Sequence, residues 1–342
     1  MPRVSVVIPS YNRPEFLLEA IENVQQQTYR DLEILVVDSS TDDTSERFRS
    51  PMDRVRWVHQ PRQGRSAAKN LGLILAKGEF VAFMDCDDLW DPTKIQRQVE
   101  LFECDSDVGF TYTNQYKQRA DGTRYVRTRA DRIVSGQIHD AILRKQVYLS
   151  TSTICIRKKC IELAGMFDSS LAEQEDWDFP LRLSRYFKGA GIKEPLVTKR
   201  TRGDERSDAE FSMLRIRAMR DVLKRDRKDF TIRNLLRRRA VQAGYHCSWG
   251  RTCFQAGRVA DAFREFALAL LNNPFRLDAV VYAGASFLGI WRHDTAYRLM
   301  RLPSALRMRC ERACAKETKT STSSLVRSDP GSVKGDAGAI RV

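Results

Sequence analysis

The sequence lacks any long apolar run. Among its 342 residues no stretch of about 18 apolar residues occurs, and the longest candidate, Ala279 to Trp291, is too short to span a bilayer. Met1 to Arg3 leads directly into an apolar strand pattern instead of a charged and apolar leader, so we expect no signal sequence. The sequence therefore predicts a cytoplasmic chain without a membrane-spanning segment.

Paired cysteines and clustered histidines are also missing. The 8 cysteines include no Cys-x-x-Cys pair, and three of them lie in or beside apolar runs, so we expect reduced and mostly buried thiols. These three are Cys86, Cys104 and Cys155. The 4 histidines have no ligand-like spacing, which favours surface or packing roles. They are His59, His139, His246 and His293.

Charge is present in excess but is unevenly distributed. The formal net charge is +14, yet residues 1–110 carry 13 Lys/Arg against 19 Asp/Glu, and residues 215–312 carry 21 against 8. The basic segment fits an anionic partner, either a lipid surface or a nucleic acid. Sequence-reading nucleic-acid binders usually show interleaved aromatics or a named module, and neither occurs here. We therefore expect no nucleic acid and favour an anionic membrane surface.

Short apolar runs alternate with helical spacings in the first 84 residues. Expected strands are Val4–Ile8, Leu32–Val37, Val55–His59 and Phe80–Met84, with helices at Glu15–Gln27 and at Ser66–Leu75, the latter closed by Gly78. This alternation predicts crossover units, a mostly parallel sheet and helices on both faces. After residue 108 the pattern predicts strands at Val108–Tyr116, Thr123–Thr128, Leu149–Ile156 and Leu196–Arg200, the first two joined by a turn at Ala120–Gly122.

Polar clusters follow each of the first four expected strands. They are Ser10–Arg13, Asp38, Arg65 and Asp85–Asp88, in strand order. Because ligands of such sheets bind beyond the carboxyl ends of the strands, the four loops predict one shared site.

Three carboxylates end the fourth strand. Asp85, Asp87 and Asp88, called here the acidic triplet, offer hard oxygens that suit Mg²⁺ or Mn²⁺, and such an ion can hold a diphosphate. An Asp-x-Asp pattern alone is equally compatible with a solvated acidic turn. A second acidic cluster, Glu173–Asp178, precedes an expected helix that contains Phe179 and Leu183.

Five segments match one known enzyme family in both order and spacing. They are Val4–Arg13, Ile34–Asp38, Gly64–Gly72, Gly78–Trp90 and Glu175–Asp178. Through them the first 210 residues closely resemble the family 2 glycosyltransferases, which have a GT-A fold, use nucleotide-diphosphate sugars and invert the anomeric centre. The resemblance implies an α/β mixed sheet flanked by helices, followed here by an all-α C-terminal extension.

The resemblance assigns roles on the donor side of the site. It makes Asp87 the metal ligand, places Asp85 on the metal or the ribose, and gives Asp88 a supporting role. The nucleotide base would lie against Pro9 and Tyr11 and donate a ring N–H to Asp38, and Arg65 would add a cation near the nucleotide. The residues alone leave two plainer interpretations open: Tyr11 covers the sheet edge, and Asp38 caps the next helix.

The second acidic cluster would serve the acceptor. An acceptor hydroxyl is a poor nucleophile, and a nearby carboxylate can take its proton during attack. By resemblance Asp176 is this base, Glu175 raises its proton affinity or orients it, and Trp177 forms part of the acceptor wall. A single displacement predicts inversion. The alternative for Asp176 is a charge placed at the start of its own helix.

Three departures from the family pattern stand out. The loop Asp38–Thr41 is one residue shorter than the Asp-Asp-Gly-Ser of many members, and Lys69 stands where arginine is common. The basic segment Lys199–Asp204 lacks the histidine that often steadies the diphosphate, which leaves Arg200 or Arg202 as candidates.

The C-terminal part reads as helical. Residues 240–285 resemble one helix-turn-helix unit of the tetratricopeptide kind, and residues 315–342 have the composition of a disordered tail. We therefore expect a transferase domain at 1–210, a basic helical extension at 211–314 and a tail at 315–342.

The predicted function is an inverting hexosyltransferase that moves a sugar, from a UDP-sugar in our expectation, to an acceptor hydroxyl. The expected acceptor is lipid-linked or a glycan, in the synthesis of cell-surface polysaccharide, glycolipid or protein glycan, with peripheral membrane attachment through the basic helices. The alternative is a helical scaffold or anionic-surface binder that carries an inactive transferase domain. A sugar-nucleotide pyrophosphorylase would need a Gly-rich, Lys-containing loop after the first strand, and Ser10–Pro14 does not supply it.

Overall fold

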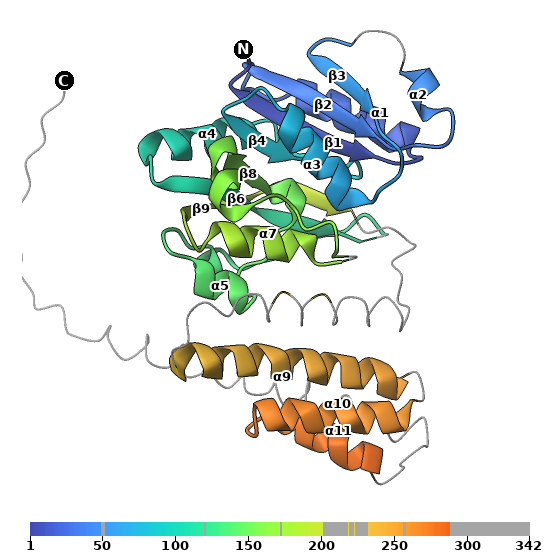
Figure 1. Ribbon diagram of the computed structural model, residues 1–342, viewed down its shortest axis with the longest axis vertical. Helices are drawn as coiled ribbons and strands as arrows, with labels where there is room; N and C mark the ends of the chain where they lie inside the picture. The colour runs from blue at the N-terminus through green and yellow to red at the C-terminus, as the bar shows by residue number, and fades with distance from the viewer. Residues whose placement is uncertain are drawn as a thin grey trace, which may run out of the picture.

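A mixed β-sheet flanked by helices forms the N-terminal part of the computed structural model. The structure describes residues 1–48, 52–119, 121–171, 173–200, 218, 222, 232–255 and 258–287. In the sheet the strands follow the order β3-β2-β1-β4-β8-β6-β9-β5, and β7 pairs with β6. Figure 1 shows this sheet above a separate layer that contains α9, α10 and α11.

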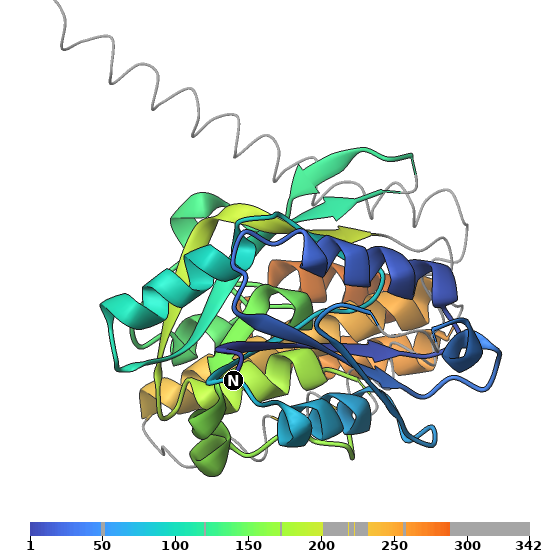
Figure 2. The same ribbon diagram turned by 90° about the horizontal axis from the view of Figure 1, so that it is seen from above.

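The first half of the sheet is built from parallel crossover units. Its elements are β1 (Val4–Ser10), α1 (Pro14–Gln25), β2 (Leu32–Asp38), α2 (Thr44–Arg47), β3 (Val55–His59), α3 (Arg65–Leu75) and β4 (Phe80–Phe83). Strands β1, β2, β3 and β4 pair in parallel, which confirms the expectation for this region. Seen from above, α1 and α3 lie on opposite sides of these strands (Figure 2).

The two faces of the sheet bury alternate residues of β1. Val6 and Ile8 belong to the core on the α1 side, and Val7 belongs to the core on the α3 side. Because both faces are covered, the strand reads as a continuous apolar run instead of an alternating one. Neighbouring strands β2 and β4 contribute to both cores in the same way.

The second half of the sheet is largely antiparallel. Its elements are β5 (Asp88–Trp90), α4 (Lys94–Cys104), β6 (Val108–Gln118), β7 (Arg124–Val126), α5 (His139–Leu143), β8 (Ile154–Arg157), α6 (Ile161–Ala164), α7 (Glu175–Leu183) and β9 (Lys188–Arg200). Strand β8 runs antiparallel to β4 and to β6, and β5 runs antiparallel to β9. The expected hairpin between β6 and β7 is confirmed.

Two expectations about elements and one about burial are wrong. The segment Leu149–Ile156 is a strand only from Ile154, because Thr151–Thr153 form a 3₁₀ turn, η2, in which the Thr153 hydroxyl donates to the Ser150 carbonyl. Helix α3 is capped at Ala76, whereas Gly78 packs on β1, where a Cβ would lie 2.6 Å from the Ser5 nitrogen. Cys104 is exposed, although Cys86 and Cys155 are buried as expected.

Strand β9 is much longer than expected. It begins at Lys188 instead of Leu196, and it pairs in parallel with almost the whole of β6. Its first half contains Gly189 and Gly191, which lie against the rings of Phe110 and Tyr112. Glycine is unfavourable in most strands, but here the close approach of a ring leaves no room for a side chain.

Three C-terminal helices pack around their own small core. They are α9 (Ile232–Gln255), α10 (Val259–Asn272) and α11 (Leu277–Phe287). Gly250 of α9 lies against the ring of Phe266 of α10, where a Cβ would be 2.7 Å from the ring. The two helices therefore approach closely at a small residue. Arg202 and the expected tail at 315–342 lie outside the described residues.

No helix in the part of the chain that the structure describes combines the length and the apolar character needed to cross a membrane.

Candidate functional site

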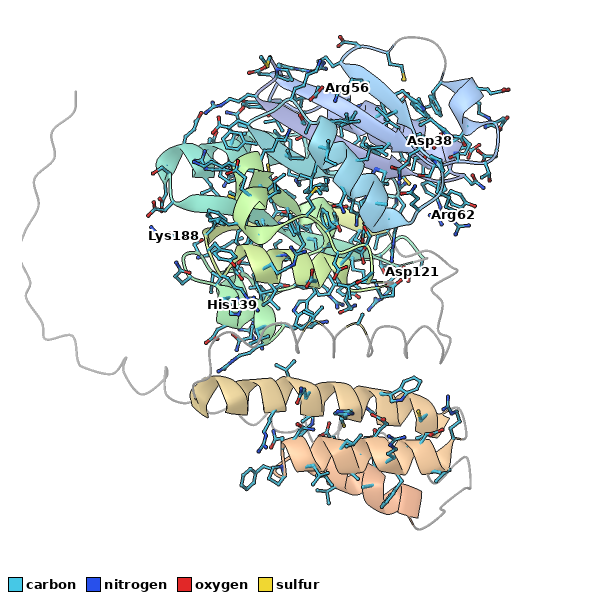
Figure 3. The ribbon with its side chains drawn as sticks, in the orientation of Figure 1. Asp38, Arg56, Arg62, Asp121, His139 and Lys188 are labelled. Carbon is cyan, nitrogen blue, oxygen red and sulfur yellow. The ribbon has the colours of Figure 1, made fainter. Side chains whose placement is uncertain are left out.

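The loops after β1 and β2 meet at one end of the sheet. The Ser39 N–H donates to the Ser10 carbonyl at 2.9 Å, and the Asn12 N–H donates to the Ser40 hydroxyl at 2.8 Å. In Figure 3, Asp38 and Arg62 lie at this end of the domain, whereas Lys188, at the start of β9, lies at the opposite end. The carboxyl ends of the parallel strands thus form the rim that the sequence predicts.

Asp38 is fully buried at the end of β2. Its Oδ1 accepts hydrogen bonds from the Ser40 N–H at 3.2 Å and from the Ser40 hydroxyl at 2.6 Å, and its Oδ2 lies 3.8 Å from His59 Nδ1. The structure does not support the interpretation of Asp38 as a helix cap, because α2 begins six residues later and Asp42 accepts the Thr44 N–H at 3.0 Å.

Tyr11 is stacked by an arginine that the sequence reasoning did not identify. The Arg62 guanidinium lies 4.3 Å from the centre of the Tyr11 ring, and its Nη1 donates to the tyrosine hydroxyl at 3.0 Å. Pro9, half-buried in β1, pairs in register with Val37 of β2. Arg62 comes from the loop that leads into α3, three residues before Arg65 at the start of that helix, and its position in this loop was the available signal.

The acidic triplet is a tight cluster at the end of β4. Single oxygens of Asp85, Asp87 and Asp88 all lie within 4.8 Å of one another. The Ser152 side chain, from η2, organises two of them: its hydroxyl accepts the Asp85 N–H at 3.0 Å and donates to Asp88 Oδ2 at 2.6 Å. Asp88 Oδ1 is buried and has no hydrogen-bond partner among the described residues. Such an orphaned acceptor fits a cluster that binds a cation.

Basic side chains from distant parts of the chain surround this triplet. Lys199 Nζ, near the end of β9, lies 3.4 Å from Asp85 Oδ2 and 3.5 Å from Asp88 Oδ2. Arg13 Nη1 lies 3.6 Å from Asp87 Oδ2. Arg200 is committed elsewhere, since its Nε donates to the Asp87 carbonyl and its Nη1 pairs with Glu19 at 2.7 Å.

The carboxyl groups of the triplet ionise differently. Burial opposes ionisation of Asp85, but the charges of Lys69, Lys199 and Arg65 outweigh it and hold the pKa of Asp85 well below its usual value. Burial raises the pKa of Asp88 to about 6, helped by the charges of Asp85 and Asp87 and opposed by Lys199.

The second acidic cluster is anchored by a buried lysine. Lys69, from α3, is 1% exposed, and its Nζ donates to Glu175 Oε1 at 3.2 Å and to the Thr151 hydroxyl at 3.0 Å. Burial disfavours the charged form of Glu175, but Lys69 and Arg65 reverse the effect and lower its pKa. Glu175 is therefore held as a carboxylate next to Asp176.

Asp176 is half-buried in the first turn of α7, and its pKa is raised above the usual value. Burial raises the pKa of Asp176, the neighbouring charge of Glu175 raises it further, and Lys199, Lys69 and Lys145 oppose both effects. The N-cap position of α7 is Gln174, not Asp176. Trp177, expected in an acceptor wall, is 6% exposed and donates its ring N–H to the Ile142 carbonyl at 2.8 Å, so it belongs to the core.

Arg65 pairs with the second acidic cluster. Its Nη2 lies 2.8 Å from Glu173 and its Nε lies 3.6 Å from Glu175. Loss of solvent lowers the pKa of Arg65, but the charges of Glu175, Glu173, Asp85 and Asp176 together hold it above the usual value. The Arg65 guanidinium therefore interacts electrostatically with carboxylates of both the acidic triplet and the second acidic cluster.

Comparison with protein families gives a match over much of this domain. Residues 5–162 match the family described as glycosyl transferase family 2. An uncharacterized glycosyltransferase of Rickettsia felis is 37% identical over 145 residues, which are 42% of this chain and 24% of that protein. The chain thus spans about a quarter of the length of that curated relative. The Escherichia coli protein named UDP-Glc:alpha-D-GlcNAc-diphosphoundecaprenol beta-1,3-glucosyltransferase WfaP is 36% identical over 122 residues, 35% of this chain and 48% of that protein.

Two solved structures share the fold. Residues 1–349 of TarS from S. aureus superpose with a TM-score of 0.58 at 17% identity, covering 84% of this chain and 92% of that one. The mannosyltransferase PcManGT from Pyrobaculum calidifontis, solved with GDP-Man and Mn²⁺, superposes with a TM-score of 0.54 at 19% identity, covering 88% and 84%. TarS has also been solved with UDP and with UDP-GlcNAc.

Proposed function

The N-terminal domain of this chain belongs to glycosyl transferase family 2 and has the GT-A fold, and from this premise we propose that it is an active, inverting glycosyltransferase. It moves a hexose from a nucleotide-diphosphate sugar to an acceptor hydroxyl. The observation that carries the proposal is that η2 joins the two acidic clusters: Ser152 donates to Asp88 of the triplet, and its neighbour Thr151 accepts from Lys69, which also pairs with Glu175. A donor held by the triplet and an acceptor held at Asp176 would therefore react in one charged site.

The acidic triplet suits a divalent metal. Its donors are all carboxylate oxygens, which Mg²⁺ and Mn²⁺ prefer, and the unpartnered Asp88 Oδ1 leaves acceptor capacity beside them. Asp85 and Asp87 would hold the ion, with Asp88 supporting them. When bound, such an ion neutralises charge on the leaving diphosphate.

Asp176 is proposed as the general base. Its pKa is raised by burial and by Glu175, which brings its proton affinity closer to that of an efficient base at neutral pH. In the reaction Asp176 takes the hydroxyl proton of the acceptor as that oxygen attacks the anomeric carbon from the face opposite the diphosphate. One displacement without a covalent enzyme intermediate inverts the configuration.

The other end of the rim is proposed to hold the nucleotide. Asp38 can accept an N–H of the base, and Pro9 and Tyr11 offer it a flat surface, with Arg62 beside them. A ring N–H is present in uracil and in guanine. We favour a UDP-sugar, in line with the UDP-Glc in the name of the E. coli relative and with the UDP complexes of TarS, although PcManGT was solved with GDP-Man.

The acceptor is proposed to be lipid-linked or a glycan. The name of the E. coli relative contains a sugar on diphosphoundecaprenol, a lipid acceptor of this kind. The net positive charge of residues 215–312 supports attachment at an anionic membrane surface, on the cytoplasmic side.

Two substitutions test the proposed chemistry. We expect Asp87→Ala and Asp176→Asn each to reduce sugar transfer by at least about 10²-fold, a common effect of losing a general base, while the unfolding transition stays cooperative. Transfer is measured with a panel of UDP- and GDP-sugars in the presence of Mn²⁺. Glu194→Gln, an exposed carboxylate on β9, serves as the control and keeps wild-type activity.

The outcomes separate this function from its alternative. Full activity of the Asp176→Asn protein would remove Asp176 from the role of base. If no nucleotide diphosphate binds to the wild-type protein, the interpretation as a helical scaffold with an inactive transferase domain gains support.

A further inference from the structure

We propose that Lys199 is a built-in cation of the acidic triplet, which competes with the divalent metal for Asp85 and Asp88 and is displaced when the metal and the donor diphosphate bind together. The inference rests on the proposed function, because it assumes that the triplet binds a metal and a nucleotide diphosphate.

The geometry places the lysine between two carboxylates that the metal would also need. Lys199 Nζ lies 3.4 Å from Asp85 Oδ2 and 3.5 Å from Asp88 Oδ2. Strand pairing fixes this position, since Lys199 of β9 is the register partner of Asp88 in β5. The Lys199 side chain is 34% exposed while that of Asp88 is 1% exposed, so the ammonium reaches the carboxylates from the accessible side.

Charge repulsion makes the two cations exclusive. An ammonium and a dication about 4 Å apart repel each other strongly even at the effective dielectric constant of a protein surface. Arg13 also contacts the triplet, but it faces Asp87, whereas Lys199 faces the other two carboxylates. Metal binding at Asp85 therefore requires Lys199 to move.

Lys199 is free to move in a way that its neighbour is not. Arg200 is fixed by the Asp87 carbonyl, by Glu19 and by the ring of Phe16, 5.0 Å from its guanidinium carbon. The Lys199 ammonium instead lies beside the carboxylates of Asp85 and Asp88, and its four-carbon stem is flexible. The oxygens of a diphosphate at the same rim would give the displaced ammonium a new anionic partner.

This exchange predicts a linkage between metal and nucleotide. When the metal binds alone, the displaced Lys199 ammonium loses its carboxylate partners and gains no new anion. When the diphosphate is also present, the ammonium is paired with the carboxylates before metal binding and with the diphosphate after it. Lys199 thus lowers the affinity for the metal alone and increases the factor by which the diphosphate raises that affinity. By thermodynamic linkage the metal raises the affinity for the diphosphate by the same factor.

Titration calorimetry of the full chain at pH 8 tests the inference. Mn²⁺ is titrated alone and then in the presence of UDP or, in a second series, GDP. We expect Lys199→Met to bind Mn²⁺ alone at least about fivefold more tightly than the wild type and to show a smaller enhancement by the nucleotide, as loss of a typical coupling energy would give. Lys193→Met, an exposed lysine of the same strand, should behave as the wild type.

Further variants identify the cause of each result. Lys199→Arg retains a cation and should bind Mn²⁺ alone as weakly as the wild type, and Asp87→Asn should abolish Mn²⁺ binding if the signal comes from the triplet. Lys199→Gln replaces the methionine variant if that protein does not fold. Equal or weaker binding of Mn²⁺ alone by the neutral Lys199 variants would overturn the inference and leave the metal site intact. Absence of Mn²⁺ and nucleotide binding in the wild type would instead overturn the proposed function itself.

Discussion

At the scale of single residues, the site is governed by buried charges that hold one another in defined states. Lys69 is enclosed by the core and pairs with Glu175, so removal of either partner leaves a buried charge without compensation. Glu175 in turn acts on Asp176 through its negative charge. The proton affinity of the proposed base is therefore set by a neighbour and not by Asp176 alone.

Substitution of this neighbour should move the pH dependence of the enzyme. Asp176 must be deprotonated to act, and Glu175 raises its pKa, so Glu175→Gln lowers the pKa of Asp176 and shifts the acidic limb of the kcat/KM profile to lower pH. Lys199, Lys69 and Lys145 lower the pKa of Asp176 in both proteins, so the difference between the two profiles reports the charge of Glu175. The kcat/KM profile of each protein is measured between about pH 4 and pH 9, at pH values where both proteins remain folded.

Glu173→Gln provides the comparison for this experiment. Glu173 pairs with Arg65 at 2.8 Å but is not among the main groups that set the pKa of Asp176. The acidic limb of this variant should coincide with that of the wild type. An unchanged acidic limb in Glu175→Gln would show that another group controls the protonation step.

At the scale of elements, α3 carries both Arg65 and Lys69 into the site, and its position depends on one glycine. A Cβ on Gly72 would lie 2.2 Å from Cγ1 of Val7, which is fully buried in β1. The helix can approach the sheet this closely only because residue 72 has no side chain. The close contact also fixes the height at which the first turn of α3 reaches the two acidic clusters.

Gly72→Ala should therefore destabilise the fold although alanine is the better helix former. Overpacking of a buried contact typically costs about 1–3 kcal/mol, which exceeds the gain of about 1 kcal/mol in helix propensity. Val7→Ala in the same chain should recover part of the loss by making room. Gly284→Ala in α11, where a Cβ meets nothing within 4 Å, should instead stabilise by about 0.5–1 kcal/mol. Urea unfolding measures all four proteins, and a neutral Gly72→Ala would contradict the packing argument.

At the scale of the whole molecule, charge is divided between the two ends of the sequence. The acidic balance lies in residues 1–110, which contain the triplet, and the basic excess lies in residues 215–312. Arg239 of α9 is exposed. This division supports the proposal that the chain approaches an anionic surface through its C-terminal part while the catalytic rim remains separate.

Neutralisation of part of the basic excess tests that proposal. We expect Arg237→Gln, Arg238→Gln and Arg239→Gln together to weaken sedimentation with phosphatidylserine-containing vesicles by about tenfold or more, since each arginine near such a surface contributes about 1 kcal/mol. A triple Arg124→Gln, Arg129→Gln and Arg132→Gln variant removes the same charge from exposed positions of the N-terminal domain and should bind as the wild type. Equal binding by both triple variants would count against a membrane role for this part of α9.

The sequence determined the parallel half of the sheet and the composition of the rim. Runs such as Val55–His59 are local patterns, and Asp38 and the acidic triplet follow strands directly, so one pattern reveals both the element and its polar end. The sequence pattern did not predict the glycine-containing start of β9 or the turn at Thr151–Thr153. The first packs against aromatic rings and the second hydrogen-bonds to a carboxylate, and neither contact leaves a periodic pattern in the sequence.

Only the tertiary structure decided which charges face each other. Lys199 and Asp85 are 114 positions apart in the chain, and Lys69 and Glu175 are 106 positions apart. Such pairs follow from strand order and helix packing, which no local pattern specifies. The sequence therefore determined which chemical groups the rim contains, and the fold decided that a lysine lies among the carboxylates proposed to bind the metal.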